Sequence, residues 1–334
     1  MLKKEDIDRC AELIAAYRKE MAVRITGQRE MIDGLLASLI AGGHILLEGV
    51  PGLAKTLAVK SLAEITGLDF KRIQFTPDLL PADLTGTMIW EQASGNFSVR
   101  RGPVFANVIL ADEINRAPAK VQSALLEAME EKQVTIGENS LPLPSPFLVL
   151  ATENPIEHEG TYSLPEAELD RFLMKLLVVY PQPVEELEIV KNSPPFSSGS
   201  AGTKAPLSAV LNTENLAFLR NAADSIHIDE EINKYIVSIV TATRPAKTAQ
   251  ASGAVEGVYR YVSFGASPRA SIALYRCCRI FAMFEGRNYA SPEDVKTCAY
   301  PVLRHRIVLS YEAEAEGMDA DAVIARILSH VPVP

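Results

Sequence analysis

Apolar side chains recur every three or four positions in residues 5–20 and again in residues 28–41. This spacing predicts two amphipathic helices. From residue 44 onward the pattern changes to short, almost continuous apolar runs, each long enough for one strand. They are HILLE (44–48), FKRIQF (70–75), VILAD (108–112), FLVLATE (147–153) and MKLLVVY (174–180). Helical stretches separate most of these runs, and the alternation predicts an α/β fold with a parallel sheet covered on both faces.

Two short segments interrupt this alternation. Residues 87–99 contain a turn signal at Ser94-Gly95, and residues 133–143 contain another at residues 137–139. Both segments predict β-hairpins inserted into the α/β fold.

The chain changes character after the last of these strands. Residues 192–203 carry no charge and are rich in Ser, Pro and Gly, which is typical of a linker. We therefore expect an α/β domain over residues 1–192, with the N-terminal helix and both hairpins, a linker over 193–206, and an all-helical domain over 207–334. The expected helices of the second domain cover residues 213–223, 229–242, 268–285, 292–303 and 319–329.

Charge and composition exclude several classes of protein. The 33 Lys and Arg residues against 42 Asp and Glu residues give a net charge of −9, which disfavours a protein that coats nucleic acid. No run reaches the ~20 uncharged apolar residues of a membrane-spanning helix. Charges within the N-terminal apolar pattern predict no signal peptide, so the cytoplasm is the expected compartment. The four cysteines form no CxxC pair, so we expect buried thiols rather than a metal site.

The first strand leads directly into a glycine-rich loop and a helix, which is the order of a phosphate-binding loop. Glycines let backbone N–H groups face phosphate, and the helix N-terminus favours negative charge. We expect Lys55 to neutralise the β and γ phosphates of ATP and the Thr56 hydroxyl to ligate Mg²⁺. Ala54 departs from the strict pattern, which has Gly before the Lys, and the alternative is a plain turn that opens a helix. The expected nucleotide contacts are Gly49, Pro51, Gly52, Leu53, Ala54, Lys55, Thr56 and Leu57.

Two adjacent carboxylates follow the buried strand VILAD. Ligands of open α/β sheets bind at the carboxyl ends of strands, where both carboxylates fall. With the upstream loop, Asp112 is expected to hold Mg²⁺ through water, and Glu113 to orient and deprotonate the attacking water. The alternative is a carboxylate that caps the helix beginning near Pro118.

Two other polar positions are candidates on local grounds. Asn154 ends the strand FLVLATE at the same edge of the sheet, where an amide could position water, although a turn residue before Pro155 is an equal alternative. Ser267 and Pro268 predict the start of a helix that carries Arg269 in its first turn. A cation there opposes the helix dipole, which indicates another purpose for Arg269.

Taken together, GVPGLAKT, VILADEINRA, LATENP, AELDRF and GASPRA resemble the MoxR family of AAA+ ATPases, in the helix-2-insert branch. The resemblance spans nearly the whole chain. It implies sheet order 5-1-4-3-2, a helix-2 insert at residues 87–99, a hairpin before sensor 1 at residues 133–143, and a helical lid. By the same resemblance Lys55 and Thr56 belong to Walker A, Asp112 and Glu113 to Walker B, and Asn154 to sensor 1.

The resemblance also implies two arginines that touch nucleotide. Arg171 matches the arginine finger, which would reach nucleotide bound by a neighbouring subunit, and its alternative is an ion pair with Asp170 or Glu168. Arg269 matches sensor 2, with its action in the same subunit or the next left open. Arg116 fits an interface residue or a solvated surface residue equally well. Ile25 to Gln28 resembles the segment that lines the adenine pocket, with Gln28 as its candidate contact, or is a simple helix entry.

The function implied by the resemblance is Mg²⁺-dependent ATP hydrolysis in a hexameric ring of identical chains. The work would be done on a protein client, with a separate von Willebrand factor A domain protein as a partner and metal-cofactor insertion as one outcome. One alternative is a nucleic-acid motor, which the net charge of −9 disfavours. Another is a nucleotide-gated scaffold, which the intact set of Lys55, Asp112, Glu113 and Asn154 disfavours.

Overall fold

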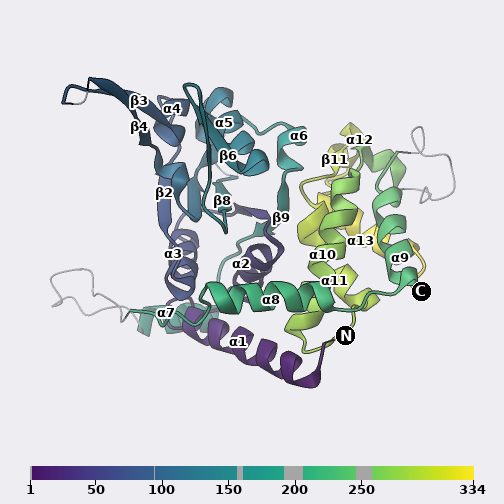
Figure 1. The fold of residues 1–334 in the computed structure, drawn as a ribbon. Helices are drawn as coiled ribbons and strands as arrows, with labels where there is room; N and C mark the ends of the chain where they lie inside the picture. The colour runs from purple at the N-terminus through teal and green to yellow at the C-terminus, as the bar shows by residue number, and fades with distance from the viewer. Residues whose placement is uncertain (1, 94, 156–160, 192–205, 246–257) are drawn as a thin grey trace. The chain divides into compact units, whose positions relative to one another are not determined.

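The computed structural model describes residues 2–93, 95–155, 161–191, 206–245 and 258–334, drawn in Figure 1. The chain divides into two compact units. The sheet unit comprises Ala15–Leu164 and Leu176–Leu216, and the helical unit comprises Met1–Ile14, Pro165–Lys175 and Ala217–Pro334. Each unit is therefore built from segments that are far apart in the sequence. Residues 193–205 of the expected linker lie outside the described residues.

The chain forms a five-stranded sheet in the order β2-β5-β8-β1-β9, and its edge strand β9 begins in the segment that is grouped with the helical unit. The pairings of β2 with β5, β5 with β8 and β8 with β1 are parallel. Counted in chain order from the other edge, the five strands read 5-1-4-3-2, which confirms the expected topology and the α/β fold. The strands are β1 (His44–Glu48), β2 (Phe70–Gln74), β5 (Val108–Asp112), β8 (Leu148–Glu153) and β9 (Phe172–Leu177).

The apolar runs mark the central strands well because those strands are buried on both faces. Every residue of β1 and β5 except the last is buried, whereas the edge strand β2 buries only Ile73. The expected boundary of the last strand was wrong, since β9 covers residues 172–177 rather than 174–180. Phe172 is fully buried, whereas Val179 and Tyr180 continue the apolar pattern on exposed chain.

Helices and two hairpins complete the sheet unit. α2 and α3 pack beside the sheet, and α2 buries a continuous stretch from Met31 to Ile40. Both expected hairpins form, and the Met88 side chain lies against Gly137 where they meet. The hairpins are β3 (Gly86–Glu91) with β4 (Asn96–Arg101), and β6 (Gln133–Ile136) with β7 (Asn139–Pro142). The helices are α1 (Lys4–Ala22), which begins in the helical unit, α2 (Arg29–Ala41), α3 (Lys55–Thr66), α4 (Pro81–Thr85), α5 (Ala119–Glu131) and α7 (Pro183–Lys191).

The helical unit has the expected helices within one or two residues of their expected ends. Side-chain caps fix where several begin: Ser267, Asp229 and Asp319 each accept a hydrogen bond from a backbone N–H of the first turn. Its elements are α6 (Glu166–Leu169), α8 (Thr213–Ser225), α9 (Glu230–Ala242), α10 (Pro268–Phe284), α11 (Pro292–Leu303), α12 (Tyr311–Ala315), α13 (Ala320–His330), and the short strands β10 (Val262–Phe264) and β11 (Val308–Leu309). The pattern of apolar positions did not predict β10 and β11.

The four cysteines are buried free thiols, as expected. Burial raises the pKa of Cys277 and Cys278 to about 12, so both are protonated at neutral pH. In the part of the chain that the structure describes, no helix has both the length and the apolar character to cross a membrane.

Candidate nucleotide site

The glycine-rich loop joins the carboxyl end of β1 to the first turn of α3. Gly49 has no room for a side chain, because a Cβ there would lie 2.6 Å from the carbonyl oxygen of Val178. Gly52 and Ala54 have φ of 89° and 57°, so the loop passes twice through the left-handed region before α3 begins at Lys55. This turn directs the helix N-terminus, with its unpaired N–H groups, toward the edge of the sheet.

Lys55 lies where the loop closes. Its ammonium group donates a hydrogen bond to the carbonyl oxygen of Gly49. Burial lowers the pKa of Lys55, against the opposing influence of Asp112 and Glu113. A partly desolvated cation of this kind gains more from a phosphate than a solvated one does.

A cavity of about 380 Å³ opens between the loop and the carboxyl ends of the strands. It brings together most of the residues expected at a nucleotide site, including both carboxylates and Asn154. Gly49 and Gln28 are the two expected contacts that do not line it. The lining consists of Pro51, Gly52, Leu53, Ala54, Lys55, Thr56, Leu57, Arg72, Asp112, Glu113, Thr152, Glu153 and Asn154.

Thr152, at the end of β8, holds the two carboxylates in place. Its hydroxyl donates to Oδ1 of Asp112 at 2.6 Å and accepts the backbone N–H of Glu113 at 2.8 Å. Glu113 has φ of 57°, a conformation that only a small fraction of non-glycine residues adopt. The buried hydroxyl therefore stabilises a bend that presents Asp112 and Glu113 to the same cavity.

Arg72 of β2 completes the polar wall, and Gln74 of the same strand contacts both Arg72 and Glu113; the sequence pattern alone indicated neither residue. Nη2 of Arg72 lies 2.6 Å from Oδ2 of Asp112, and it also donates to Oε1 of Gln74 at 2.9 Å. Nε2 of Gln74 donates to Oε2 of Glu113 at 2.8 Å. The signal was present in FKRIQF, because alternate polar residues on a strand share one face, but its use required knowing that β2 pairs with β5.

The remaining candidates of the sheet unit have defined partners. Nε of Arg116 lies 3.0 Å from Oε2 of Glu113, so Arg116 is ion-paired rather than simply solvated. Gln28 precedes α2 with φ of 55°, and its Nε2 donates to the carbonyl oxygen of Val179 at 2.7 Å. The 25–28 segment thus makes a tight entry into α2, and its contact is with the chain that follows β9.

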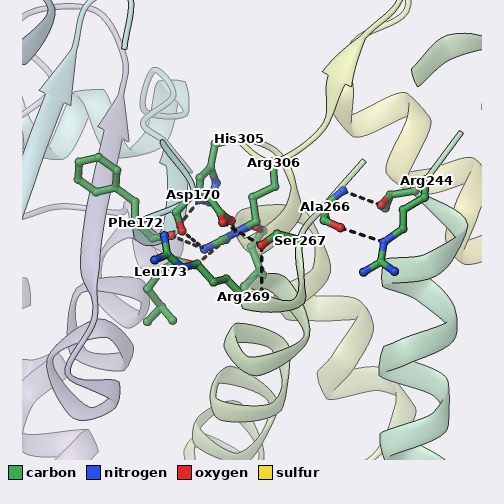
Figure 2. A network of polar contacts seen from close by, with 11 residues as sticks. Asp170, Phe172, Leu173, Arg244, Ala266, Ser267, Arg269, His305 and Arg306 are labelled. Carbon is green, nitrogen blue, oxygen red and sulfur yellow. Dashed lines mark hydrogen bonds and ion pairs between the residues drawn. The ribbon is translucent and has the colours of Figure 1, made fainter. Parts of the chain in front are cut away.

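Arg171 and Arg269 belong to the helical unit, whereas the cavity belongs to the sheet unit. Arg171 follows α6, and its backbone N–H bonds the carbonyl oxygen of Glu168. The carboxylate of Asp170 is ion-paired with Arg306 at 2.8 Å. Arg269 lies in the first turn of α10, and its N–H donates to the capping hydroxyl of Ser267, as expected (Figure 2).

Comparison with known proteins gives the family. The family model for the ATPase family associated with various cellular activities (AAA) matches residues 44–174, and the one for the AAA lid domain matches residues 247–327. Chaperone MoxR1 of Mycobacterium tuberculosis is 47% identical over 310 residues, covering 93% of this chain and 79% of that protein. Protein MoxR of Paracoccus denitrificans is 33% identical over 93% of both chains. This chain is a MoxR-family AAA+ ATPase.

A solved structure supports the same fold. The putative ATPase from Cytophaga hutchinsonii superposes with a TM-score of 0.87 at 49% identity, over 99% of this chain and 97% of that one. The match of the ATPase family model to residues 44–174 covers every residue that lines the cavity at the end of β1.

The oxygen groups in the cavity wall fit a magnesium ion. Thr56 offers a hydroxyl and Asp112 a carboxylate, and Mg²⁺ prefers such hard oxygen ligands while it keeps several waters. When bound, the ion neutralises charge on the β and γ phosphates. The protein side of this chemistry is the hydrogen bond from Thr152, which orients the Asp112 carboxylate.

Proposed function

We propose that this MoxR-family ATPase hydrolyses ATP with Mg²⁺ as a ring of identical subunits, a hexamer, and uses the energy to remodel or activate protein clients. Lys55 binds the β and γ phosphates, while Thr56 and Asp112 hold the metal with its waters. Glu113 takes the proton of the attacking water, and Asn154 positions that water. Arg171 and Arg269 stabilise the charge of the transition state at the γ-phosphate.

One observation supports the catalytic part above all others. The N-terminal end of α3, with Lys55, and the strand-end carboxylates of Asp112 and Glu113 line the same cavity. A helix N-terminus binds phosphate, and a carboxylate next to the terminal phosphate can activate water, so one cavity offers both groups that hydrolysis of a triphosphate needs. The segment from Ile25 to Gln28 remains our proposal for the adenine side.

The client part rests on similarity. MoxR1 of Mycobacterium tuberculosis, at 47% identity, is named as a chaperone. We extend the same class of activity to this chain, with a separate von Willebrand factor A domain protein as the proposed partner. We also retain the functional division into an ATPase domain over 1–192, a linker over 193–206 and a lid over 207–334.

Two substitutions separate binding from hydrolysis. Lys55→Ala should abolish binding of a fluorescent ATP analogue, because a desolvated phosphate pocket without its cation repels the triphosphate. Glu113→Gln should still bind the analogue but lose phosphate release by about 100-fold or more, since it removes the base alone. Glu127→Gln, which neutralises an exposed carboxylate on α5, is the matched control. Hydrolysis at the wild-type rate by Glu113→Gln would refute the assigned role.

Dilution tests whether subunits complete each other's sites. We expect the turnover per subunit to rise with protein concentration to a plateau, because an arginine from a neighbouring subunit is needed at each nucleotide. The rise should coincide with assembly measured by sedimentation. A turnover per subunit that stays constant while sedimentation shows dissociation would contradict the shared site.

A further inference from the structure

Asp170 links the segment that carries Arg171 to the helix that carries Arg269, entirely within the helical unit (Figure 2). Its Oδ1 accepts a hydrogen bond from Nε of Arg306 at 2.8 Å, and its Oδ2 accepts one from the hydroxyl of Ser267 at 2.8 Å. The same hydroxyl accepts the backbone N–H of Arg269 at 3.1 Å. One carboxylate and one hydroxyl therefore connect the backbones that bear the two arginines.

Arg306 holds the chain on both sides of Arg171. Its side chain is 3% exposed, and each of its N–H groups has an acceptor. Nη1 donates to the carbonyl oxygens of Leu173 and Val302, and Nη2 donates to those of Asp170 and Phe172. These contacts fix the backbone immediately before and after Arg171.

The two residues that precede Arg306 also donate hydrogen bonds to this backbone segment. Nε2 of His305 donates to the carbonyl oxygen of Phe172 at 3.0 Å, and Nη1 of Arg304 donates to that of Lys175 at 3.0 Å. Residues 304–306 thus bind the backbone of residues 170–175 as a continuous clamp. We call Asp170, Ser267 and Arg306 the Asp170 cluster.

The loop before α10 is fixed from another side. The N–H of Ala266 donates to the Thr243 hydroxyl at 2.9 Å, and Nε of Arg244 donates to the Ala266 carbonyl oxygen at 3.2 Å. A Cβ on Gly265 would lie 2.4 Å from the carbonyl oxygen of Thr243, so only glycine fits there. Ser267 consequently has little freedom to move away from Asp170.

Local structure alone could not hold Arg171 in this way. α6 has four residues, which is too short for a stable helix without tertiary contacts. A buried guanidinium is costly unless a carboxylate and hydrogen bonds compensate it, and such a satisfied network favours one geometry over others. The Asp170 cluster therefore acts on position more than on net stability.

We propose that Asp170, Ser267 and Arg306 are positioning residues that hold Arg171 in a fixed relation to Arg269, so that the two arginines reach the nucleotide as a pair. This inference rests on the proposed function, which gives both arginines a role at the γ-phosphate. It adds that one hydrogen bond at Ser267 fixes the segment of Arg171 to the start of the helix that carries Arg269.

Ser267→Ala is the test, because it removes the bond to Asp170 and leaves the Arg306 ion pair intact. We expect kcat to fall about tenfold with unchanged ATP affinity, since a displaced arginine weakens only the transition state. Ser267→Thr keeps the hydroxyl and should restore kcat. Ser310→Ala is the matched control, since Ser310 also caps a helix of this unit, α12, without contact to Asp170. All variants are compared on the plateau of the dilution series.

A double-mutant cycle distinguishes this inference from the proposed function. If Ser267 acts through Arg171, Ser267→Ala should cause no further loss of kcat in an Arg171→Ala background. Three outcomes would overturn the positioning role and leave the arginine finger in place. They are kcat losses of Ser267→Ala and Arg171→Ala that multiply in the double variant, an unchanged kcat in Ser267→Ala, and an equal loss of kcat in Ser310→Ala. Wild-type turnover by Arg171→Ala would instead refute the finger itself, and the inference with it.

Discussion

Arg72 and Asp112 form an ion pair inside the nucleotide cavity, with Nη2 of the guanidinium 2.6 Å from Oδ2 of the carboxylate. The register of β2 on β5 creates this contact, because it sets Gln74 opposite Asp112. Arg72 lies two residues before Gln74 and therefore on the same face of the strand. The guanidinium of Arg72 therefore forms an ion pair with the same carboxylate that is proposed to hold Mg²⁺ through water, and the two cations compete for it.

Arg72→Ala should lower the Mg²⁺ concentration for half-maximal ATPase activity. Because the guanidinium is half exposed, the competition is worth little, and we expect a shift of about threefold. Two Mg²⁺ titrations measure this shift. One follows phosphate release by the wild type and by Arg72→Ala, and the other follows analogue binding by Glu113→Gln with and without Arg72→Ala. Lys71→Ala removes a charge from the other face of β2 and serves as the control. A higher Mg²⁺ requirement in Arg72→Ala would show instead that Arg72 helps to assemble the site.

Thr152→Val should reduce both stability and turnover. The substitution keeps the shape but leaves the Glu113 N–H and Oδ1 of Asp112 without their buried partner, which costs about 1–3 kcal/mol of unfolding free energy. With Asp112 and Glu113 less well oriented, kcat should also fall about tenfold. Urea denaturation and steady-state kinetics are the measurements. Thr152→Ser retains the hydroxyl and should be close to wild type, and equal losses in both variants would point to packing instead.

The candidate site could be predicted from the sequence wherever its residues follow one another along the chain. Lys55 and Thr56 follow a strand and open a helix, and Asp112 and Glu113 end a buried strand, so local patterns predict their common edge of the sheet. Arg72 could not be placed in this way, because its role depends on which strand lies beside β2.

The least predictable contacts are those that join remote segments. Arg306 reaches Asp170 across 136 residues, and nothing in the local pattern around either residue indicates the pairing. The same applies to the assignment of residues 165–175 to the helical unit, since the expected domain boundary lay after residue 192. Local sequence patterns predicted the helices and strands. Which unit contains Arg171 depends instead on side-chain packing between segments that are far apart in the sequence.

Ala54→Gly should leave nucleotide binding intact and change stability little. Ala54 adopts φ of 57°, which costs about 1 kcal/mol for a residue with a Cβ, and glycine removes that cost while gaining freedom in the unfolded chain. We expect the net change in unfolding free energy to lie within about 1 kcal/mol, as measured by urea denaturation. Ala58→Gly, inside α3, is the control and should destabilise by about 1 kcal/mol or more. A comparable loss in Ala54→Gly would contradict the strain at this position.

Because the His44 ring is buried in its neutral form, the protein should become less stable in acid. Its ring is buried between the carbonyl oxygen of Met129 and the N–H of Val149, and burial lowers its pKa to about 4, with a smaller contribution from Lys132. Above pH 6.5 the ring is neutral in both the folded and the unfolded state. Between pH 6.5 and 4 the unfolded state binds the proton first, so the unfolding free energy falls as pH falls, by about 3 kcal/mol in total.

Urea denaturation at several pH values between 7.5 and 4 measures this loss. His44→Gln keeps an acceptor and a donor in the same places and should show a weaker pH dependence than the wild type. His227→Gln replaces an exposed histidine and should leave the dependence unchanged. If His44→Gln loses as much stability in acid as the wild type, another group carries the effect.

Mixing two inactive variants tests whether Arg171 acts across a subunit boundary. Arg171→Ala subunits retain Glu113, and Glu113→Gln subunits retain Arg171, so a site between one of each is complete. Random rings of equal parts should recover about a quarter of wild-type turnover, because half of the subunits carry the base and half of their neighbours carry the finger. Mixing Arg171→Ala with the Arg171→Ala, Glu113→Gln double variant is the control, since no complete site can form. Recovery in the test mixture alone would establish the finger in trans, whereas two equally inactive mixtures would contradict it.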